Sequence, residues 1–243
     1  MLKKKIDLMG FTLAEVLITL GIIGIVAAMT ISTVMSKIND FENIQAWKKI
    51  YSEISNAYNL AVKDNVPLSY PTNSFIGFDA ETVNTILSYM NIVQKCKNPS
   101  GGKSVEMGFT DRDCSASDKW MSLNNDYKSL SGKTFSFVNS TRIAVQTPSG
   151  SVIYIGGDFQ PIWGVDVNGF GKGPNTIGKD VFGIAFTKAW MRPIGAMGAD
   201  FKAGLNYGAQ KCSDDYYDVS SDNVYLPRAA GSGCSAKYIL GNK

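Results

Sequence analysis

The N-terminal sequence KKKIDLMGFTLAEVLITLGIIGIVAAMTI, residues 3–31, decides how this chain is organised. Three lysines precede an apolar run that continues from Phe11 to Ile31, with Glu15 as its one strongly polar residue. About 20 apolar residues are enough for a helix to cross a bilayer. The lysines stay in the cytoplasm by the positive-inside rule, so the pattern predicts a single membrane span with the remainder of the chain outside.

The apolar pattern continues beyond residue 31 as a one-sided stripe. Its members recur at steps of three or four, the period of an amphipathic helix. They are Met35, Ile38, Phe41, Ile44, Trp47, Tyr51, Ile54, Tyr58 and Ala61. No proline interrupts the pattern before Pro67. We therefore expect one helix from about Phe11 to Val62, whose second half packs a soluble domain through the whole stripe.

The rest of the chain has the pattern of a small α+β domain. Asp79 is a suitable N-cap for a short helix with Val83, Ile86 and Leu87 on one face. The runs with strand character are residues 134–138, 142–147, 152–156, 162–167 and 181–187. Pro148-Ser149-Gly150 predicts a hairpin turn between two of them. We expect an antiparallel sheet of about four to five strands packed on the helix, with residues 96–134 and 188–243 irregular.

Composition argues against two classes of function. The net charge of the 243 residues is only +3, and basic residues beyond the N-terminus are scattered singly, which is not the pattern of an electrostatic nucleic-acid binder. The chain has no histidine, so the commonest general base is missing, and it contains no recognisable nucleophile or phosphate-binding motif. We expect a protein that is not an enzyme.

The four cysteines are Cys96, Cys114, Cys212 and Cys234. They allow three pairings, of which the simplest joins Cys96 to Cys114 and Cys212 to Cys234, so that each bond closes a local loop. Zinc is not expected, because CxxC spacing and histidine are both missing. Export to an oxidising compartment favours disulfides, and buried free thiols are the alternative.

Two interpretations explain the N-terminus as an export signal. In the first, residues 1–28 form an ordinary signal peptide that is cut after Val26-Ala27-Ala28, which leaves Met29 as the new N-terminus. An exported enzyme would fit this interpretation. It leaves both Glu15 and the continuity of the helical stripe unexplained. In the second, cleavage falls before the apolar run, between Gly10 and Phe11.

The second interpretation is carried by GFTLAEVLI, residues 10–18, between a basic leader and an apolar run. This motif resembles the class III leader of type IV pilins and type II secretion pseudopilins, and the resemblance covers only about the first 31 residues. It implies that prepilin peptidase cuts after Gly10, that Phe11 becomes a methylated N-terminus, and that Glu15 acts in assembly. Many family members carry a proline just past the apolar run, where it kinks the helix; this chain departs from that pattern, because the same place reads TIST, residues 30–33.

The resemblance also implies a division of the chain and a function. Residues 1–10 are the leader, 11–31 the transmembrane and polymerisation helix, 32–62 its amphipathic continuation, and 63–243 a pilin-like head. We expect a structural subunit precursor of a type IV pilus or a secretion pseudopilus. Its partners are the peptidase, other subunits and the inner membrane, from which it passes into an extracellular or periplasmic filament. The alternative is a minor pilin whose head is an adhesive or DNA-binding module.

The presence of Glu15 in an apolar span has a physical explanation. An ionised carboxylate in hydrocarbon costs about 2.5–3.5 kcal/mol unless it is paired. Cleavage would free the α-amine of Phe11, one helical turn away, and such an amine is cationic at neutral pH. The amine of one subunit can then pair with the carboxylate of its neighbour in a staggered bundle. The alternative is that Glu15 snorkels to the headgroups.

A second candidate site lies in the sequence DVNGFGKGPNTIGKD, residues 166–180. Asp166, Asn168 and Asp180 supply oxygen atoms of the kind that calcium prefers. The spacing is loosely similar to that of the calcium loop of major pseudopilins, and it does not match an EF-hand. Asn168-Gly169 as a simple tight turn is the alternative, and Lys172 and Lys179 argue against a cation. Calcium is thus the one cofactor that the sequence suggests.

Overall fold

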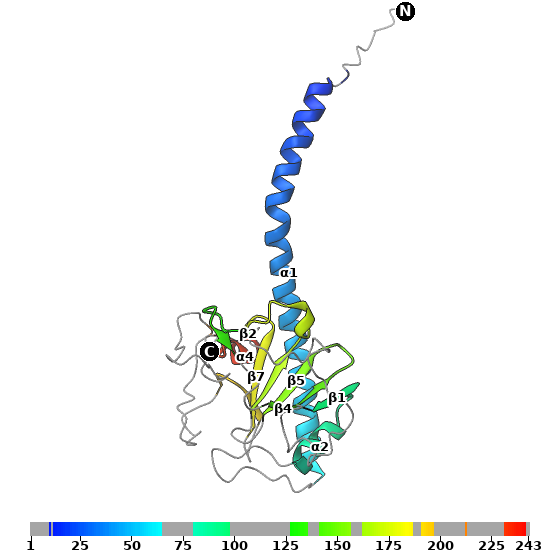
Figure 1. The fold of residues 1–243 in the computed structure, drawn as a ribbon, viewed down its shortest axis with the longest axis vertical. Coiled ribbons are helices and arrows are strands. Elements are labelled where there is room, and N and C mark those ends of the chain that lie inside the picture. The colour runs from blue at the N-terminus through cyan, green and yellow to red at the C-terminus, as the bar shows by residue number, and fades with distance from the viewer. Residues whose placement is uncertain are drawn as a thin grey trace, which may run out of the picture. The chain divides into compact units, whose positions relative to one another are not determined.

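The computed structural model describes residues 10, 12–64, 80–97, 127–135, 141–156, 162–186, 191–196, 212 and 231–241. The chain forms two compact units, Met1–Phe41 and Glu42–Lys243, and helix α1 contributes to both (Figure 1). The first unit, where it is described, is helical from Leu13 onward, and the second is an α+β domain.

Helix α1 runs without interruption over Leu13–Lys63, 51 residues, and confirms the predicted single helix. No proline lies within it, and its two glycines, Gly21 and Gly24, do not interrupt it, so the helix continues through the end of the apolar run. Its buried residues begin only at Asn43. They are Asn43, Trp47, Ile50, Ile54, Ala57, Tyr58 and Ala61.

The prediction that the whole stripe packs the domain is wrong for its first members. Met35, Ile38 and Phe41 are exposed, whereas Trp47 is fully buried. Three residues span about 300° of an α-helix, which is about 60° less than a full turn. The stripe moves from Met35 to Trp47 in four such steps, so its direction rotates around the helix axis by about 240° in total. The sequence pattern therefore contains two apolar faces of α1 that follow one another along the chain.

The second unit contains a six-stranded antiparallel sheet with the strand order β1-β4-β5-β6-β7-β8. The strands are β1 (Gln94–Lys97), β4 (Thr141–Gln146), β5 (Val152–Gly156), β6 (Ile162–Asp166), β7 (Val181–Phe186) and β8 (Met191–Pro193). The bounds of β4 to β7 agree with the predicted runs to within one residue, and the predicted turn joins β4 to β5. The sheet has six strands, more than the expected four to five, because β1 and β8 form its two edge strands.

A separate two-stranded sheet pairs β2 (Tyr127–Lys128) with β3 (Thr134–Phe135). The predicted run at 134–138 thus begins as a strand, and its last residues lie outside the described part of the chain. This hairpin is joined to the loop after β6 by a bridge between Lys128 and Thr176. It therefore brings Tyr127 to the end of the main sheet, where the candidate cation site lies.

The core lies between the second half of α1 and the sheet, and its four largest fully buried side chains are aromatic. Trp47 stacks on Phe182 with ring centroids 4.9 Å apart, and Phe186 contacts both Tyr58 and Trp163 at centroid distances of 5.7 and 4.7 Å. Such pairs contribute about 0.5–1.5 kcal/mol beyond the burial of their area. They fix α1 against β6 and β7, the two strands that carry the loop with the candidate cation site.

Two short α-helices, α2 (Ala80–Ser88) and α4 (Cys234–Leu240), and one 3-10 helix, η2 (Phe170–Lys172), complete the described fold. α2 is the predicted short helix, and its proposed N-cap Asp79 lies outside the described residues. α4 corrects the expectation that 188–243 is irregular. The indole N–H of Trp47 donates to the carbonyl of Ser235 at 3.0 Å, and the backbone N–H of Gly183 donates to its hydroxyl at 2.9 Å. α4 is therefore tied to both α1 and the sheet.

The disulfide Cys212–Cys234, one of the two pairs in the simplest pairing, is present and joins Cys212 to the first residue of α4. We expect the double substitution Cys212→Ser with Cys234→Ala to destabilise the head by about 3 kcal/mol. The disulfide restricts the unfolded chain by closing a loop, and without it the unfolded chain regains that conformational entropy. Chemical denaturation of the full chain in detergent measures the loss. A change below about 1 kcal/mol would show that the contacts of Ser235 alone hold α4.

Candidate functional site

The first candidate site is the N-terminus of α1, where Thr12 and Glu15 form a reciprocal capping box. The backbone N–H and the hydroxyl of Thr12 both donate to Oε2 of Glu15 at 2.8 Å, and the backbone N–H of Glu15 donates to the Thr12 hydroxyl at 3.3 Å. This arrangement satisfies donors that a helix start leaves unpaired. Its sequence signature is T-x-x-E before an apolar run, which Thr12 to Glu15 provide, so this capping box was predictable from the sequence.

The capping box changes the interpretation of Glu15 without removing its proposed partner. Both Thr12 hydrogen bonds end on Oε2, and among the described residues no donor reaches Oε1. The carboxylate is therefore held in one orientation by its own helix and keeps an oxygen available. Gly10 is exposed, whereas the rest of the leader and Phe11 lie outside the described residues, so the cleavage site remains a prediction.

The helix that begins here is long and apolar enough to cross a membrane, and it is the only such helix in the described part of the chain. Its large apolar side chains up to Phe41 are exposed in the structure. A helix of this kind near an N-terminus is consistent with a single membrane span or with a signal-like segment. The long exposed apolar surface requires a non-aqueous environment, whether lipid or protein.

The second candidate site lies where the β6–β7 hairpin turns. Asp166 is the last residue of β6 and pairs with Val181, so Asp180 sits immediately beside the same end of the sheet. Both aspartates are fully buried. The hairpin therefore brings together two carboxylates that are 14 positions apart in the sequence, as the calcium hypothesis requires.

Asp166 is surrounded by hydrogen-bond donors. Its Oδ2 accepts from the Tyr127 hydroxyl at 2.8 Å, and its Oδ1 accepts from the backbone N–H groups of Gly169 at 2.8 Å and Asn168 at 3.3 Å. The Tyr127 hydroxyl also lies 2.7 Å from that of Tyr154. Because the Tyr127 proton goes to the carboxylate, Tyr154 donates to Tyr127, and the two hydroxyls form a directed chain toward Asp166.

The carboxylate of Asp180 accepts hydrogen bonds from the backbone at residues 175–176, just before β7. Its Oδ1 accepts from the backbone N–H of Thr176 at 2.7 Å, and its Oδ2 accepts from that of Asn175 at 2.8 Å. Asn168 completes the cluster, since its amide nitrogen donates to the carbonyl of Gly173 at 2.9 Å and to Oδ2 of Asp180 at 3.4 Å. Asp166, Asn168 and Asp180 are therefore brought together in one buried cluster.

The cluster also contacts α1. Asn43, buried within the helix, accepts a long hydrogen bond of 3.5 Å from the Asn168 amide nitrogen. Sequence analysis did not mark Asn43, although it is a polar residue at a position that the helical period places inside. A buried amide on the packing face of a helix is the available signal for such a contact.

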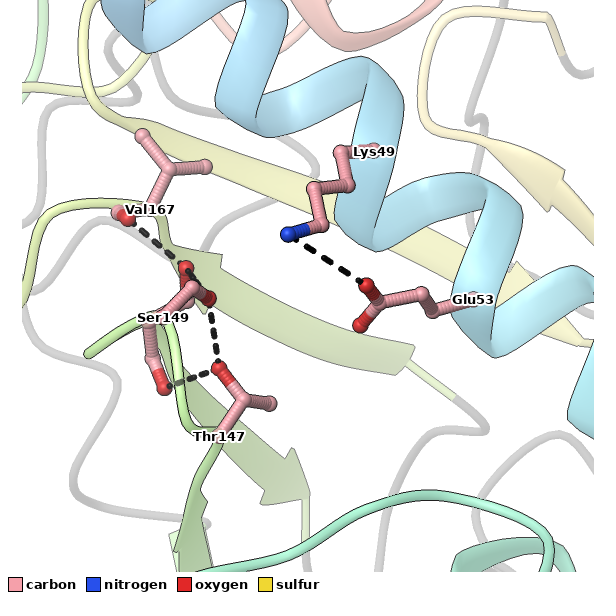
Figure 2. Close-up of polar contacts among 6 residues, drawn as sticks. Lys49, Glu53, Thr147, Ser149 and Val167 are labelled. Atoms are coloured by element: carbon pink, nitrogen blue, oxygen red, sulfur yellow. Dashed lines mark hydrogen bonds and ion pairs between the residues drawn. The ribbon is translucent and has the colours of Figure 1, made fainter.

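The neighbouring β4–β5 turn supports the loop. The Thr147 hydroxyl lies 2.9 Å from that of Ser149, and the Ser151 hydroxyl donates to the carbonyl of Val167 at 2.7 Å (Figure 2). Gly169 lies against the same turn with a φ of +79°, and a Cβ there would be 2.9 Å from the carbonyl oxygen of Gly150. The loop therefore contains both a tight turn at Gly169 and the polar cluster.

Figure 2 also shows Lys49 and Glu53 paired on α1. The two residues are one turn apart, and Nζ of Lys49 lies 4.0 Å from Oε1 of Glu53. Both side chains are 45% exposed or more, so the pair adds only a few tenths of a kcal/mol. Among the described residues no lysine or arginine forms an ion pair with Asp166 or Asp180. The two buried carboxylates are thus surrounded by neutral donors.

Because no cationic side chain among the described residues compensates the two buried carboxylates, their pKa values are raised. Burial, reinforced by the charge of Asp180, raises the pKa of Asp166 to about 7 despite its three hydrogen bonds. Burial also raises the pKa of Asp180, and the backbone N–H groups of Thr176 and Asn175 oppose that rise. Either a proton or a bound cation would relieve the repulsion between the two carboxylates.

Two unpaired atoms distinguish these possibilities. The side-chain oxygens of Asn168 and Asn175 are buried and have no hydrogen-bond partner among the residues that the structure describes. Both are good ligands for calcium, which also accepts carboxylates and backbone carbonyls. The described residues contain no cluster of three or more acidic, cysteine or histidine side chains, so these amide oxygens would have to complete the ligand set. The residues present therefore fit a calcium ion better than a transition metal.

The remaining predicted site residues are the cysteines. Cys212 and Cys234 form the disulfide described above. Cys96 lies on edge strand β1, and Cys114 lies outside the described residues, so their pairing remains a prediction. Comparison with protein families, with characterised proteins and with solved structures gives no match for this chain. The architecture is pilin-like, and the resemblance in the leader stands on its motif alone.

Proposed function

We propose that this chain is the precursor of a pilin-like structural subunit that polymerises through α1 into a type IV pilus or a type II secretion-type pseudopilus. One observation carries the proposal: α1 is a single 51-residue helix whose first part is apolar and exposed and whose last part is the core of an antiparallel domain. Such a helix can exchange lipid for other helices without unfolding the domain that it carries.

Processing precedes assembly in this proposal. Prepilin peptidase cuts between Gly10 and Phe11 while α1 spans the inner membrane, with the lysines in the cytoplasm. The cut removes the charged leader and creates an amine one turn from Glu15. The capping box orients that carboxylate, and its available Oε1 accepts the amine of a neighbouring subunit. The ion pair compensates two charges that lipid would not solvate and sets the axial register between helices.

The experiment is the intact mass of the mature chain from membrane and sheared-filament fractions. The expected mass begins at a methylated Phe11 and includes intact disulfides. A chain that begins at Met29 would overturn the proposal and support a secreted protein released by signal peptidase. Abundance in sheared filaments indicates a major subunit, whereas trace amounts indicate a minor pilin with a surface-binding head.

The loop at 166–180 holds a structural calcium ion in this proposal. Asp166, Asp180 and the side-chain oxygens of Asn168 and Asn175 are the candidate ligands, and the ion would neutralise the buried carboxylates. It would act on the stability of the head, because it would relieve the repulsion between two buried carboxylates.

Calcium binding is expected to raise the melting temperature of the full chain in detergent. The expected rise is roughly 5 °C or more for an increment of about 2–3 kcal/mol, which corresponds to a calcium concentration of roughly 100 times Kd. Asn175→Ala removes an amide oxygen without touching either carboxylate and is expected to abolish most of the rise. An equal rise with magnesium, or a rise that Asn175→Ala leaves intact, would contradict this site.

A further inference from the structure

The candidate cation loop and the disulfide Cys212–Cys234 meet at Gly178. A Cβ atom added to Gly178 would lie 2.9 Å from Sγ of Cys234 and 2.9 Å from the carbonyl oxygen of Gly231. A Cβ atom added to Gly231 would in turn lie 2.5 Å from the carbonyl oxygen of Ile177. The two segments therefore pack backbone against backbone, and the sulfur of Cys234 lies against the loop itself.

Residues 175–178 connect this contact to the candidate ligands of the cation. The backbone N–H groups of Asn175 and Thr176 donate to the carboxylate of Asp180 at 2.8 and 2.7 Å. Asn175 also carries one of the buried amide oxygens that could bind the ion. The next two residues along the chain are buried, and the second of them is Gly178. The same short piece of backbone therefore contacts the cation site at one end and the disulfide at the other.

The β2–β3 hairpin fixes this piece of backbone as well. The backbone N–H of Lys128 donates to the carbonyl of Asn175, and the backbone N–H of Ile177 donates to the carbonyl of Lys128, both at 2.9 Å. Tyr127, beside Lys128, donates to the carboxylate of Asp166 at 2.8 Å. The hairpin thus holds both the backbone of the loop and one of its carboxylates. Ordering the cation site and ordering the turn that carries the disulfide therefore involve the same residues.

We propose that the cation site and the disulfide Cys212–Cys234 are thermodynamically linked, so that each one favours the other. The inference rests on the calcium site of the proposed function and specifies its regulation. The bond holds Cys234 against Gly178 and so orders residues 175–178 before an ion binds, which leaves less conformational entropy for the ion to remove. Linkage is reciprocal, so the factor by which the bond tightens calcium binding equals the factor by which calcium favours the bond.

The redox step is thiol–disulfide exchange with a disulfide oxidant such as oxidised glutathione. The thiolate of one cysteine attacks oxidised glutathione and releases one reduced glutathione, and the other cysteine then displaces the second. The two cysteines lose two electrons and two protons, and one oxidised glutathione becomes two reduced molecules. Because the cytoplasm keeps thiols reduced, the linked pair is completed only after export, where oxidant and calcium are both present.

The first measurement is the Kd for calcium of the full chain in detergent, by titration calorimetry, before and after reduction with excess dithiothreitol. We expect reduction to raise this Kd at least about fivefold. Cys212→Ser removes the bond and keeps the sulfur of Cys234 beside Gly178, so it should show the raised Kd with or without reductant. The matched control, Cys96→Ser with Cys114→Ser, should respond to reductant as the unmodified chain does.

The outcomes of this titration separate the linkage from the calcium site. Equal Kd values for the oxidised and reduced chains would overturn the linkage and leave the calcium site in place. The same holds if reductant raises the Kd of Cys212→Ser, because the effect would then come from another cysteine. An oxidised chain that binds no calcium would contradict the calcium site, and the linkage with it.

The second measurement follows the bond itself and does not require the reduced chain to bind calcium. The full chain is equilibrated in a glutathione redox buffer with saturating calcium or with chelator, and its free thiols are alkylated and located by mass spectrometry. We expect calcium to raise the equilibrium constant for Cys212–Cys234 at least about fivefold, with no change in Asn175→Ala. An unchanged constant, an increase that Asn175→Ala retains, or an equal change in the labelling of Cys96 would each overturn the proposal.

Discussion

Glu15→Gln is expected to reduce filament assembly by two orders of magnitude or more while the leader is still removed. Glutamine keeps the length of the side chain and can serve in the capping box, since Glu and Gln both accept the N-cap N–H at this position. The substitution therefore leaves the start of α1 in place and removes only the charge. In a water-poor bundle the amine of the neighbouring subunit then has no counter-ion, which costs about 3–5 kcal/mol for each contact.

Thr12→Ala is the complementary variant, because it removes the hydroxyl of the cap and keeps the charge of Glu15. A lost N-cap costs about 1 kcal/mol, so we expect a frayed first turn and a reduction of assembly by no more than about tenfold. The measurement is the ratio of sheared filament protein to processed membrane protein, with the leader followed by mass. If Thr12→Ala abolishes assembly and Glu15→Gln does not, Glu15 acts as a helix cap and the proposed ion pair is wrong.

The sequence predicts the elements with a long or repeated pattern. α1 follows from an unbroken run of apolar residues and helical spacing, and the central strands follow from short β-rich runs around a Pro-Ser-Gly turn. The edge strands were missed for a physical reason. β1 is QKCK and β8 is MRP, and an edge strand buries too little to need an alternating apolar pattern.

The α4 helix was missed because its seven residues are too few to show a period. Its position depends on single contacts such as that between Trp47 and Ser235, which are 188 positions apart. No local pattern contains such a contact. The stripe on α1 is the opposite case, because its pattern is visible in the sequence but does not form a single face. Steps of three residues rotate it around the helix, so its first members do not pack on the domain.

The candidate cation site was predictable in part. The three predicted residues, Asp166, Asn168 and Asp180, lie together in the fold, because a hairpin turn brings the end of one strand to the start of the next. Calcium binding by them stays a prediction. Tyr127 and Asn43 were not predictable, since they reach the cluster from a separate sheet and from α1. Only the assembled fold shows that the carboxylates are buried without an ion-pair partner among the described residues.

That burial gives the last prediction, which concerns the pH dependence of stability without calcium. The pKa of Asp166 is raised to about 7 in the folded protein and is near its ordinary value of 3.8 in the unfolded chain. A raised carboxyl pKa means that the folded state binds the proton more tightly. The stabilisation that comes from this bound proton is therefore complete below pH 4 and is lost as the pH rises through 7. The pKa of Asp180 is also raised, so this residue adds to the loss of stability.

In excess chelator, the free energy of unfolding of the full chain in detergent is expected to fall by up to roughly 4 kcal/mol between pH 4 and pH 8. Asp166→Asn removes the titrating group and can still accept the N–H of Gly169, so its unfolding free energy should vary much less over this range. Calcium should restore most of the lost stability near pH 8 in the unmodified protein and little in Asp166→Asn, because the ion replaces the proton between the two carboxylates. If stability in chelator does not change between pH 4 and pH 8, the buried pair is stable as two anions, and the electrostatic reason for a cation in this loop is removed.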